Sequence, residues 1–243
     1  MSRFYVPKES VQGARIVIGG DEAHHIADVM RLKPSDKIVA FDGTGKEYDG
    51  VIKTIKAKSV VIEIIAERTP SAKRVAAITL IQAIPKKAKM DYIVEKATEL
   101  GASAIVPVFT RRTIPEWDGP KRAAQAARWR KIALEASKQC ARAEIPAISE
   151  IEDFIKVVKG PARYDLALIA TLGDDTVKLG AALAGSGRKA VAIAIGPEGD
   201  FTPEEVEAAR NSGFRPVSLG SRVLKSDTAG LAALAILDYE LTR

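Results

Sequence analysis

The chain has 243 residues, 47% of them hydrophobic, with one cysteine and a formal net charge of +6. This composition excludes a disordered chain and an intramolecular disulfide, and no apolar run reaches the roughly 18 residues that a membrane-spanning helix needs. Residues 73–160 carry a net charge of +7, against +1 for residues 1–72 and −2 for residues 161–243, so the middle third favours a polyanionic partner such as a nucleic acid over an ordinary basic protein.

The first 70 residues predict short strands separated by Gly and Asp turns, which is typical of a small β-barrel or sandwich. One helix interrupts them, because apolar residues from Ala23 to Met30 follow helical spacing, with Asp21 as a candidate cap. The N-terminus lacks the apolar core of a signal peptide, which predicts a cytoplasmic protein. The strands are expected at residues 14–18, 37–41, 46–55 and 59–67.

The pattern changes after a polar, proline-containing stretch at residues 67–74, which we expect to be a linker. Strands and helices then alternate, and this predicts an α/β domain with a parallel sheet covered on both faces. The expected strands are residues 75–84, 103–109, 165–170, 191–195 and 215–219. The expected helices are residues 90–101, 122–140, about 177–183, from 203 onward, and a last one to 239.

Two glycine loops follow strands near the C-terminus, GPEGD at residues 196–200 and LGSRVLKSDTAG at residues 219–230. In open α/β sheets, ligands bind at the carboxyl ends of the strands. After the first loop, Thr202 and Glu205 form a capping box around Pro203, and the acidic first turn would repel a phosphate. No dinucleotide or phosphate-loop motif is present. The loop is compatible with a cationic nucleoside such as S-adenosylmethionine, and a plain β–α turn is the alternative.

Five segments spread over essentially the whole chain resemble, in order, the signature blocks of one protein family. They are HHIADVMRLKPSDKI (24–38), KMDYIVEKATELGASAIVPVFTRR (89–112), WRKIALEASKQCAR (129–142), IGPEGDFTPEE (195–205) and LGSRVLKSDTA (219–229). That family is the bacterial 16S ribosomal RNA uridine N3-methyltransferases, which belong to the SPOUT superfamily of methyltransferases.

The resemblance implies a PUA-like, RNA-binding β-barrel at residues 1–70 and a SPOUT methyltransferase domain at residues 74–243, whose last part forms a trefoil knot. It also implies that the knotted loops bind S-adenosylmethionine, that the enzyme is a homodimer, and that it methylates N3 of a uridine in 16S rRNA of the small ribosomal subunit. No metal site is predicted, because the adjacent His24 and His25 do not share a helix face.

The chain departs from the family pattern at a few positions. Asp200 stands where the family usually has Gly, and Lys225 where it usually has Arg. Ser226 and Asp227 replace the usual Thr and Glu, and Ala141 replaces a Gly. The change to lysine removes a planar fork that can make two parallel hydrogen bonds. The cofactor site is therefore expected to be intact, whereas the substrate side differs from the pattern.

Candidate site residues follow from the resemblance. For catalysis, Arg142 or Lys225 would stabilise the developing uracil anion, and Asp227 would accept or orient the N3 proton, unless Asp227 only caps a helix. Glu198 is a second candidate base, or else holds its loop through backbone N–H groups. Val223 and Leu224 could alternatively be ordinary core. The expected cofactor-binding residues are Leu168, Ala170, Thr171, Ile195, Gly196, Pro197, Glu198, Gly199, Leu219, Gly220, Val223 and Leu224.

A basic cluster predicts contacts with RNA phosphates, with a solvated helix face as the alternative. An N-terminal arginine next to two aromatic residues could add a contact with stacking. The residues expected to bind RNA are Arg3, Arg111, Arg112, Arg122, Arg128, Arg130, Lys131 and Lys138.

Two further functions stay open from the sequence. One is a related SPOUT enzyme that methylates a 2′-hydroxyl or another rRNA or tRNA. The other is a non-catalytic RNA-binding assembly factor that keeps the fold.

Overall fold

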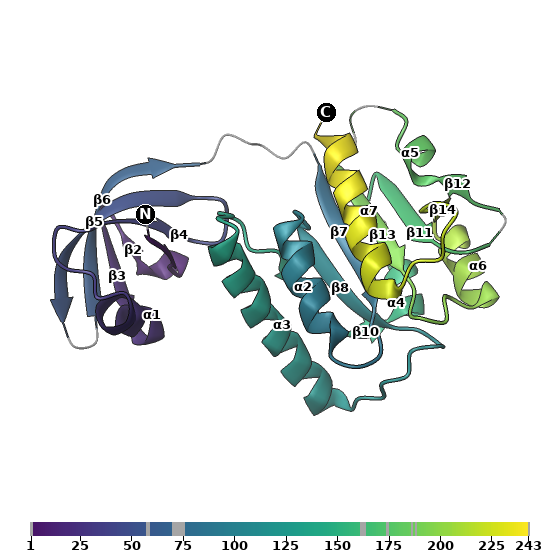
Figure 1. The fold of residues 1–243 in the computed structure, drawn as a ribbon, viewed down its shortest axis with the longest axis horizontal. Helices are drawn as coiled ribbons and strands as arrows, with labels where there is room; N and C mark the ends of the chain where they lie inside the picture. The colour runs from purple at the N-terminus through teal and green to yellow at the C-terminus, as the bar shows by residue number, and fades with distance from the viewer. Residues whose placement is uncertain are drawn as a thin grey trace. The chain divides into compact units, whose positions relative to one another are not determined.

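The computed structural model describes residues 2–56, 59–69, 76–160, 164–173, 175–185, 187 and 189–242. Its contacts divide the chain into two compact units, Met1–Lys73 with Ser137–Ile145, and Arg74–Ala136 with Pro146–Arg243 (Figure 1). The division predicted at residues 1–70 and 74–243 did not anticipate that Ser137–Ile145 groups with the first unit. Residues 70–74 of the expected linker lie outside the described residues.

The first unit contains a six-stranded sheet in the order β1-β4-β5-β6-β3-β2. β1 and β4 are parallel, and the other neighbouring pairs are antiparallel. Alternate residues of β3 and β6, such as Ile16 and Ile62, point into a buried core. The four predicted strands are present, together with two short ones at the edges. The strands are β1 (Ser2–Tyr5), β2 (Val11–Gln12), β3 (Arg15–Gly19), β4 (Lys37–Phe41), β5 (Glu47–Lys56) and β6 (Ser59–Arg68).

The helix predicted near Ala23–Met30 forms as α1 (Gly20–His24), which continues into a π-helical turn, η2 (His25–Val29). Its N-cap is Gly19 without a side-chain hydrogen bond, so the prediction that Asp21 caps it is wrong. The amide of Met30 donates to the carbonyl of His25, 2.8 Å away, which is π-type spacing. This wider winding rotates Met30 out of the apolar stripe, and its side chain is exposed.

The second unit contains a sheet in the order β10-β8-β7-β13-β11-β14-β12, with β9 also paired to β8. Its pairings are all parallel, as the alternation of strands and helices predicted. The carboxyl ends of β11, β13 and β14 therefore meet at one edge. The strands are β7 (Ala77–Ala83), β8 (Ala104–Phe109), β9 (Ala147–Ile148), β10 (Glu152–Asp153), β11 (Leu166–Ala170), β12 (Val177–Lys178), β13 (Ala190–Ile195) and β14 (Phe214–Ser218).

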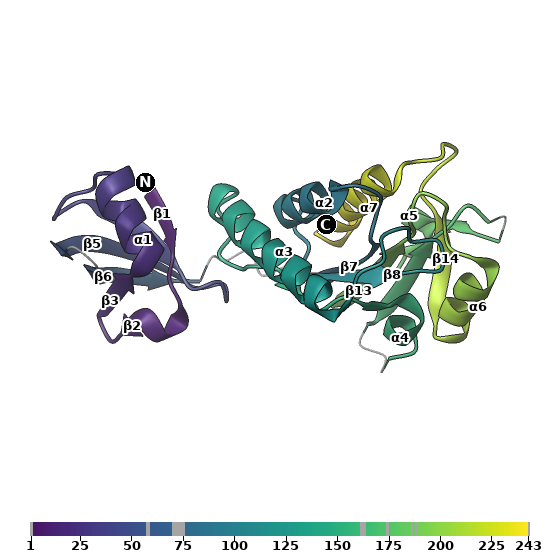
Figure 2. The ribbon, with the colours of Figure 1, turned by 90° about the horizontal axis from the view of Figure 1, so that it is seen from below.

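Helices cover both faces of this sheet. α2 and α7 pack against each other on one face, while α4 and α6 lie on the other (Figure 2). The helix expected near residues 177–183 is shorter, because residues 177–178 form β12 and pair with β14. Within the described residues, no helix is long and apolar enough to cross a membrane. The helices are α2 (Lys89–Glu99), α3 (Gly119–Gln139), α4 (Phe154–Val158), α5 (Leu179–Ala182), α6 (Pro203–Asn211) and α7 (Ser226–Leu241).

Candidate functional site

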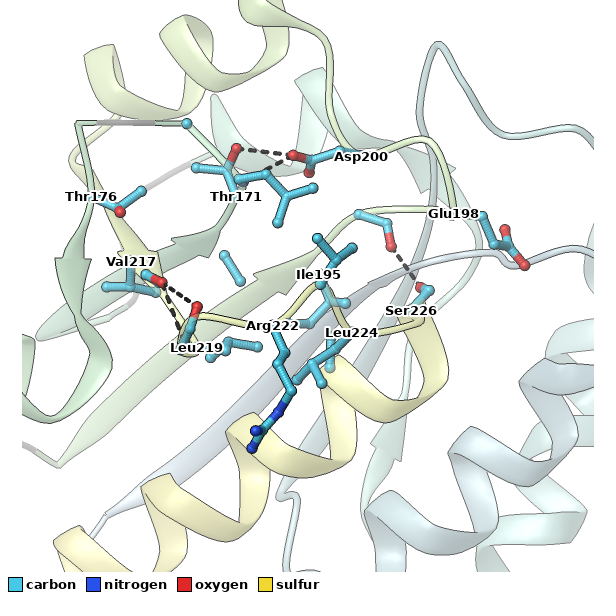
Figure 3. A pocket seen from close by; sticks show the side chains of 18 of the residues that line it. Thr171, Thr176, Ile195, Glu198, Asp200, Val217, Leu219, Arg222, Leu224 and Ser226 are labelled. Atoms are coloured by element: carbon cyan, nitrogen blue, oxygen red, sulfur yellow. Dashed lines mark hydrogen bonds between the residues drawn. The ribbon is translucent and has the colours of Figure 1, made fainter.

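A cavity of about 320 Å³ opens at the carboxyl ends of β11, β13 and β14 (Figure 3). Its walls are three chain segments: residues 170–173 with Thr176 after β11, the first glycine loop after β13, and residues 217–224 at the end of β14. Ser226 and Ala229 of α7 close one side. The cavity therefore lies where a parallel sheet is expected to hold a ligand.

Ten of the twelve residues expected to bind the cofactor line this cavity. Two do not: Leu168 is fully buried inside β11, and Gly199 faces the side chain of Arg112. Val223 is 76% exposed, so the alternative that it belongs to the core is wrong. The ten residues are Ala170, Thr171, Ile195, Gly196, Pro197, Glu198, Leu219, Gly220, Val223 and Leu224.

Several residues that line the cavity were not predicted from the sequence. Seven of the ten directly precede or follow predicted segments, so extending each segment by two positions at either end would have found them. Ala229 lies one turn into α7, where only the fold shows which side chains face the cavity. The missed residues are Leu172, Gly173, Thr176, Asp200, Val217, Ser218, Ser221, Arg222, Ser226 and Ala229.

The capping box after the first glycine loop is confirmed. Thr202 is the N-cap of α6. Its Oγ1 accepts a hydrogen bond from the amide of Glu205 at 3.3 Å, and Glu205 Oε2 accepts one from the amide of Thr202 at 2.9 Å. The other oxygen of the buried Glu205 carboxylate accepts the amide of Arg111 at 2.8 Å. In the first turn, hydrogen bonds from its own amide and from Thr202 lower the pKa of Glu204 below its ordinary value. This helix start is negative at neutral pH and disfavours a phosphate.

Asp200 follows directly and adopts a left-handed backbone, with φ of +62°. Its Oδ2 accepts hydrogen bonds from Thr171 Oγ1 at 3.1 Å and from the amide of Leu172 at 3.0 Å, while Oδ1 accepts the amide of Phe201 at 2.8 Å. Asp is one of the few residue types other than Gly that tolerate this conformation. The position that departs from the family pattern thus has a structural explanation.

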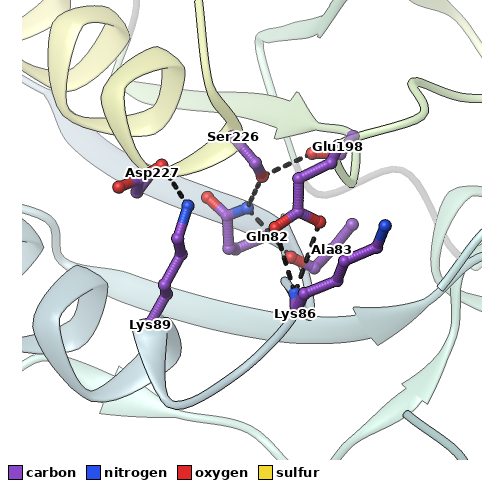
Figure 4. A network of polar contacts seen from close by, with 8 residues as sticks. Gln82, Ala83, Lys86, Lys89, Glu198, Ser226 and Asp227 are labelled. Atoms are coloured by element: carbon purple, nitrogen blue, oxygen red, sulfur yellow. Dashed lines mark hydrogen bonds and ion pairs between the residues drawn. The ribbon is translucent and has the colours of Figure 1, made fainter. Parts of the chain in front are cut away.

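A buried hydroxyl joins α7 to the first glycine loop (Figure 4). Ser226 Oγ donates to the carbonyl of Gly196 at 2.6 Å and accepts from Gln82 Nε2 at 3.0 Å. Beside it, the Glu198 carboxylate accepts the amide of Lys86 at 3.1 Å. Of the two roles considered for Glu198, this contact fits the one that holds the loop through a backbone N–H group.

Two of the three residues expected to act in catalysis, Lys225 and Asp227, lie at the start of α7. Exposed Lys225 is the N-cap residue of α7, and Asp227 in the first turn pairs with Lys89 of α2, with 3.2 Å between Oδ1 and Nζ. No side-chain cap bond is made at this helix start, so the capping alternative for Asp227 is not observed. Arg142 is half-buried and belongs to the first unit, whereas Lys225 and Asp227 belong to the second. Lys89 is a partner that sequence reasoning missed, since 138 positions separate it from Asp227.

Most of the basic residues expected to bind RNA also make contacts within the chain. Arg112 donates to the carbonyls of Gly199 at 2.6 Å and Phe201 at 3.3 Å, so it supports the first glycine loop. Arg111 and Lys131 are exposed to solvent. The other contacts are Arg3 with Glu47, Arg122 with the carbonyl of Trp117, Arg128 with Asp91, Arg130 with Glu150, and Lys138 with Glu22.

Comparison with known proteins agrees with this arrangement. Residues 72–238 match the model of an RNA methyltransferase domain, and residues 18–65 match that of an RNA methyltransferase PUA domain. The ribosomal RNA small subunit methyltransferase E of Bacillus subtilis is 29% identical, over 99% of this chain and 97% of that protein. The enzyme of the same name from Mycobacterium bovis is 30% identical, over 99% of this chain and 92% of its own.

Two solved structures are similar over their whole length. The ribosomal RNA small subunit methyltransferase E of Neisseria gonorrhoeae, bound to S-adenosylmethionine, has a TM-score of 0.87 and 31% identity, and the match covers 98% of this chain and 97% of that one. A Legionella pneumophila protein solved with the same cofactor has a TM-score of 0.85 and 30% identity, with 98% and 96% coverage.

Proposed function

Since the chain belongs to the RNA methyltransferase family, we propose that it transfers the methyl group of S-adenosylmethionine to N3 of a uridine in 16S rRNA of the small ribosomal subunit. The observation that carries this proposal is the cavity between the two glycine loops. Its neighbouring helix start is self-capped and acidic, which disfavours a phosphate and suits a cationic nucleoside. The relatives solved with S-adenosylmethionine point to the same ligand.

The residues around the cavity would hold the cofactor through backbone groups and small side chains. Gly196 and Gly220 let the main chain approach the nucleoside closely, and the carboxylates of Glu198 and Asp200 lie in the same wall. When bound, S-adenosylmethionine supplies a methyl carbon attached to a sulfonium, which is an excellent leaving group. The protein therefore has to align the uracil with the methyl group and remove the proton from its N3 atom.

Uracil N3 carries a proton that has to be lost before its lone pair can attack. In the proposed displacement, the N3–carbon bond forms as the carbon–sulfur bond breaks, and the sulfur keeps the electron pair. Asp227 is our candidate for taking or orienting the N3 proton, with Lys89 holding its carboxylate. Either Lys225 or Arg142 is our candidate for stabilising the negative charge on the base.

The remaining features of the proposal concern assembly and partners. A homodimer is supported by the exposed Tyr92 and Tyr239 on the packed helices α2 and α7, which give that pair of helices a partly apolar outer surface. A trefoil knot is part of the proposal because the family resemblance implies it, and the hydrogen bond from Ser226 to the carbonyl of Gly196 joins the segments after β13 and β14 that would form it. We propose a cytoplasmic enzyme, which fits an rRNA substrate. The exposed Arg111 and Lys131 are candidates for contacts with the RNA phosphates.

Calorimetry with S-adenosylmethionine tests the enzymatic proposal against a non-catalytic assembly factor. We expect one binding site per chain and weaker or no binding of a nucleotide with a pyrophosphate, such as NAD. The absence of any heat of binding with S-adenosylmethionine would rule out both the N3-methyltransferase and its 2′-hydroxyl alternative.

A further inference from the structure

Asp200 links two walls of the cavity that are far apart in sequence. Its carboxylate accepts hydrogen bonds from Thr171 and Leu172, directly after β11, while its own backbone belongs to the loop after β13. The third hydrogen bond, from the amide of Phe201, fixes the rotamer of the same side chain. Three donors therefore hold one carboxylate, and this keeps the end of β11 against the first glycine loop.

The loop is held from a second side by Arg112. Its guanidinium donates to the carbonyls of Gly199 and Phe201, the two residues on either side of Asp200. The backbone at residues 199–201 is thus fixed on one side while the Asp200 side chain reaches to the other. Arg112 does not line the cavity, whereas Asp200 does.

The left-handed backbone at Asp200 makes this reach possible. A glycine would adopt the same backbone but would bring no carboxylate to Thr171 and Leu172. The carboxylate also packs closely on Gly196, since a Cβ added there would lie 3.1 Å from Asp200 Oδ1. The side chain therefore sets both the distance between two walls and the space above Gly196.

We propose that Asp200 is a positioning residue, which holds the segment at residues 171–173 in the shape that binds S-adenosylmethionine. This inference rests on the proposed function and adds a role for a residue that the family pattern does not explain. Without the carboxylate, binding would have to order that segment, and the cost would appear as lost affinity. The chemistry of methyl transfer would stay nearly unchanged, because Asp200 holds the wall and does not act on the reacting atoms.

Two variants test the role by separating affinity from turnover. For Asp200→Gly we expect the KM and Kd for S-adenosylmethionine to rise about tenfold, while kcat stays within about twofold. Asparagine in Asp200→Asn keeps the shape of the side chain and tolerates the left-handed backbone, but it has only one acceptor oxygen. The affinity of this variant for S-adenosylmethionine should therefore lie between those of the wild-type protein and Asp200→Gly. Asp175→Asn is the matched control, because this carboxylate is exposed on the segment that follows and does not line the cavity.

Hydrogen exchange of the protein without ligand tests the hydrogen bond from the amide of Leu172 to Asp200 directly. We expect the amide of Leu172 to lose protection in Asp200→Gly and to keep it in Asp175→Asn. Unchanged protection in Asp200→Gly would overturn the proposal, and so would wild-type affinity in that variant or a fall in kcat as large as the rise in KM. If the wild-type protein itself bound no S-adenosylmethionine, the proposed function would fail, whereas the exchange data would still decide whether Asp200 holds this segment.

Discussion

A Cβ added at Gly196 would lie 3.1 Å from Asp200 Oδ1 and 3.2 Å from the backbone nitrogen of Phe201. Both neighbours are held by other contacts, so neither can easily move away. At the scale of single residues, the shape of the cavity therefore depends on the absence of a side chain at Gly196 as well as on the side chains that line it.

Gly196→Val should lower the affinity for S-adenosylmethionine by about 10- to 100-fold, since relieving the clash requires a shift of the loop that lines the cavity. Calorimetry measures the loss. Hydrogen exchange of the strands in both units is the control and should match that of the wild-type protein. Wild-type affinity in this variant would mean that the loop is only a β–α turn.

The Asp165 carboxylate, directly before β11, holds the start of β13 through two backbone hydrogen bonds. It accepts the amides of Lys189 and Ala190, and these hydrogen bonds lower its pKa from the ordinary value of 3.8. A lowered folded-state pKa adds stability that is fully present above the unfolded value and is lost as the pH falls through the folded value.

Asp165→Ala should therefore lower the Tm modestly at neutral pH, and this difference from the wild-type protein should shrink as the pH falls below about 4. Thermal unfolding between pH 3 and 7 measures it. The variant Asp175→Ala, which removes an exposed carboxylate nearby, should show no such trend. A Tm difference for Asp165→Ala that does not change with pH would contradict the assignment.

At the scale of elements, the contact between α7 and β7 is closer than a side chain allows. A Cβ on Gly230 of α7 would lie 2.8 Å from Oε1 of the buried Gln82, whose amide group also bonds Ser226. Gly180 of α5 is the opposite case, since a Cβ there would have no neighbour within 4 Å.

These two glycines predict effects of opposite sign. Gly230→Ala should destabilise the second unit by about 1–3 kcal/mol, because Gln82 is fixed and the added methyl overpacks the contact. Gly180→Ala should be neutral or stabilise by up to about 1 kcal/mol, because alanine reduces the entropy of the unfolded chain. Urea unfolding of both variants measures the free energies, and stabilisation by Gly230→Ala would contradict the packing described here.

The elements that the sequence predicted well are those with local causes. The capping box of Thr202 and Glu205 lies within four residues, and the buried strands are continuous apolar runs. The π-helical turn after α1 was missed because the spacing of apolar residues alone does not distinguish a π-helix from an α-helix. The ion pair of Lys89 with Asp227 and the bond from Gln82 to Ser226 join residues more than 130 positions apart, and such contacts have no signature in a single sequence.

At the scale of the whole molecule, the two-part organisation and the methyltransferase family were predictable because sequence blocks along the entire chain resemble one family. The assignment of Ser137–Ile145 to the first unit was not, since it depends on contacts such as the amide of Gly45 with the carbonyl of Ala143. The basic cluster was recognised from the charges in the sequence, but these charges could not reveal that Arg112 supports the first glycine loop. The role of the basic cluster in RNA binding stays a prediction.

Methylation of N3 of a uridine in 16S rRNA is the proposed activity of this chain. The direct measurement is to incubate the purified protein and S-adenosylmethionine with small ribosomal subunits, or with free 16S rRNA, from a strain that lacks the gene. Digestion to nucleosides and mass spectrometry then identify the product. We expect N3-methyluridine in the treated sample and none in the untreated one. A methyl group found only on a 2′-hydroxyl, or N3-methyluridine already present in the strain without the gene, would contradict the proposal.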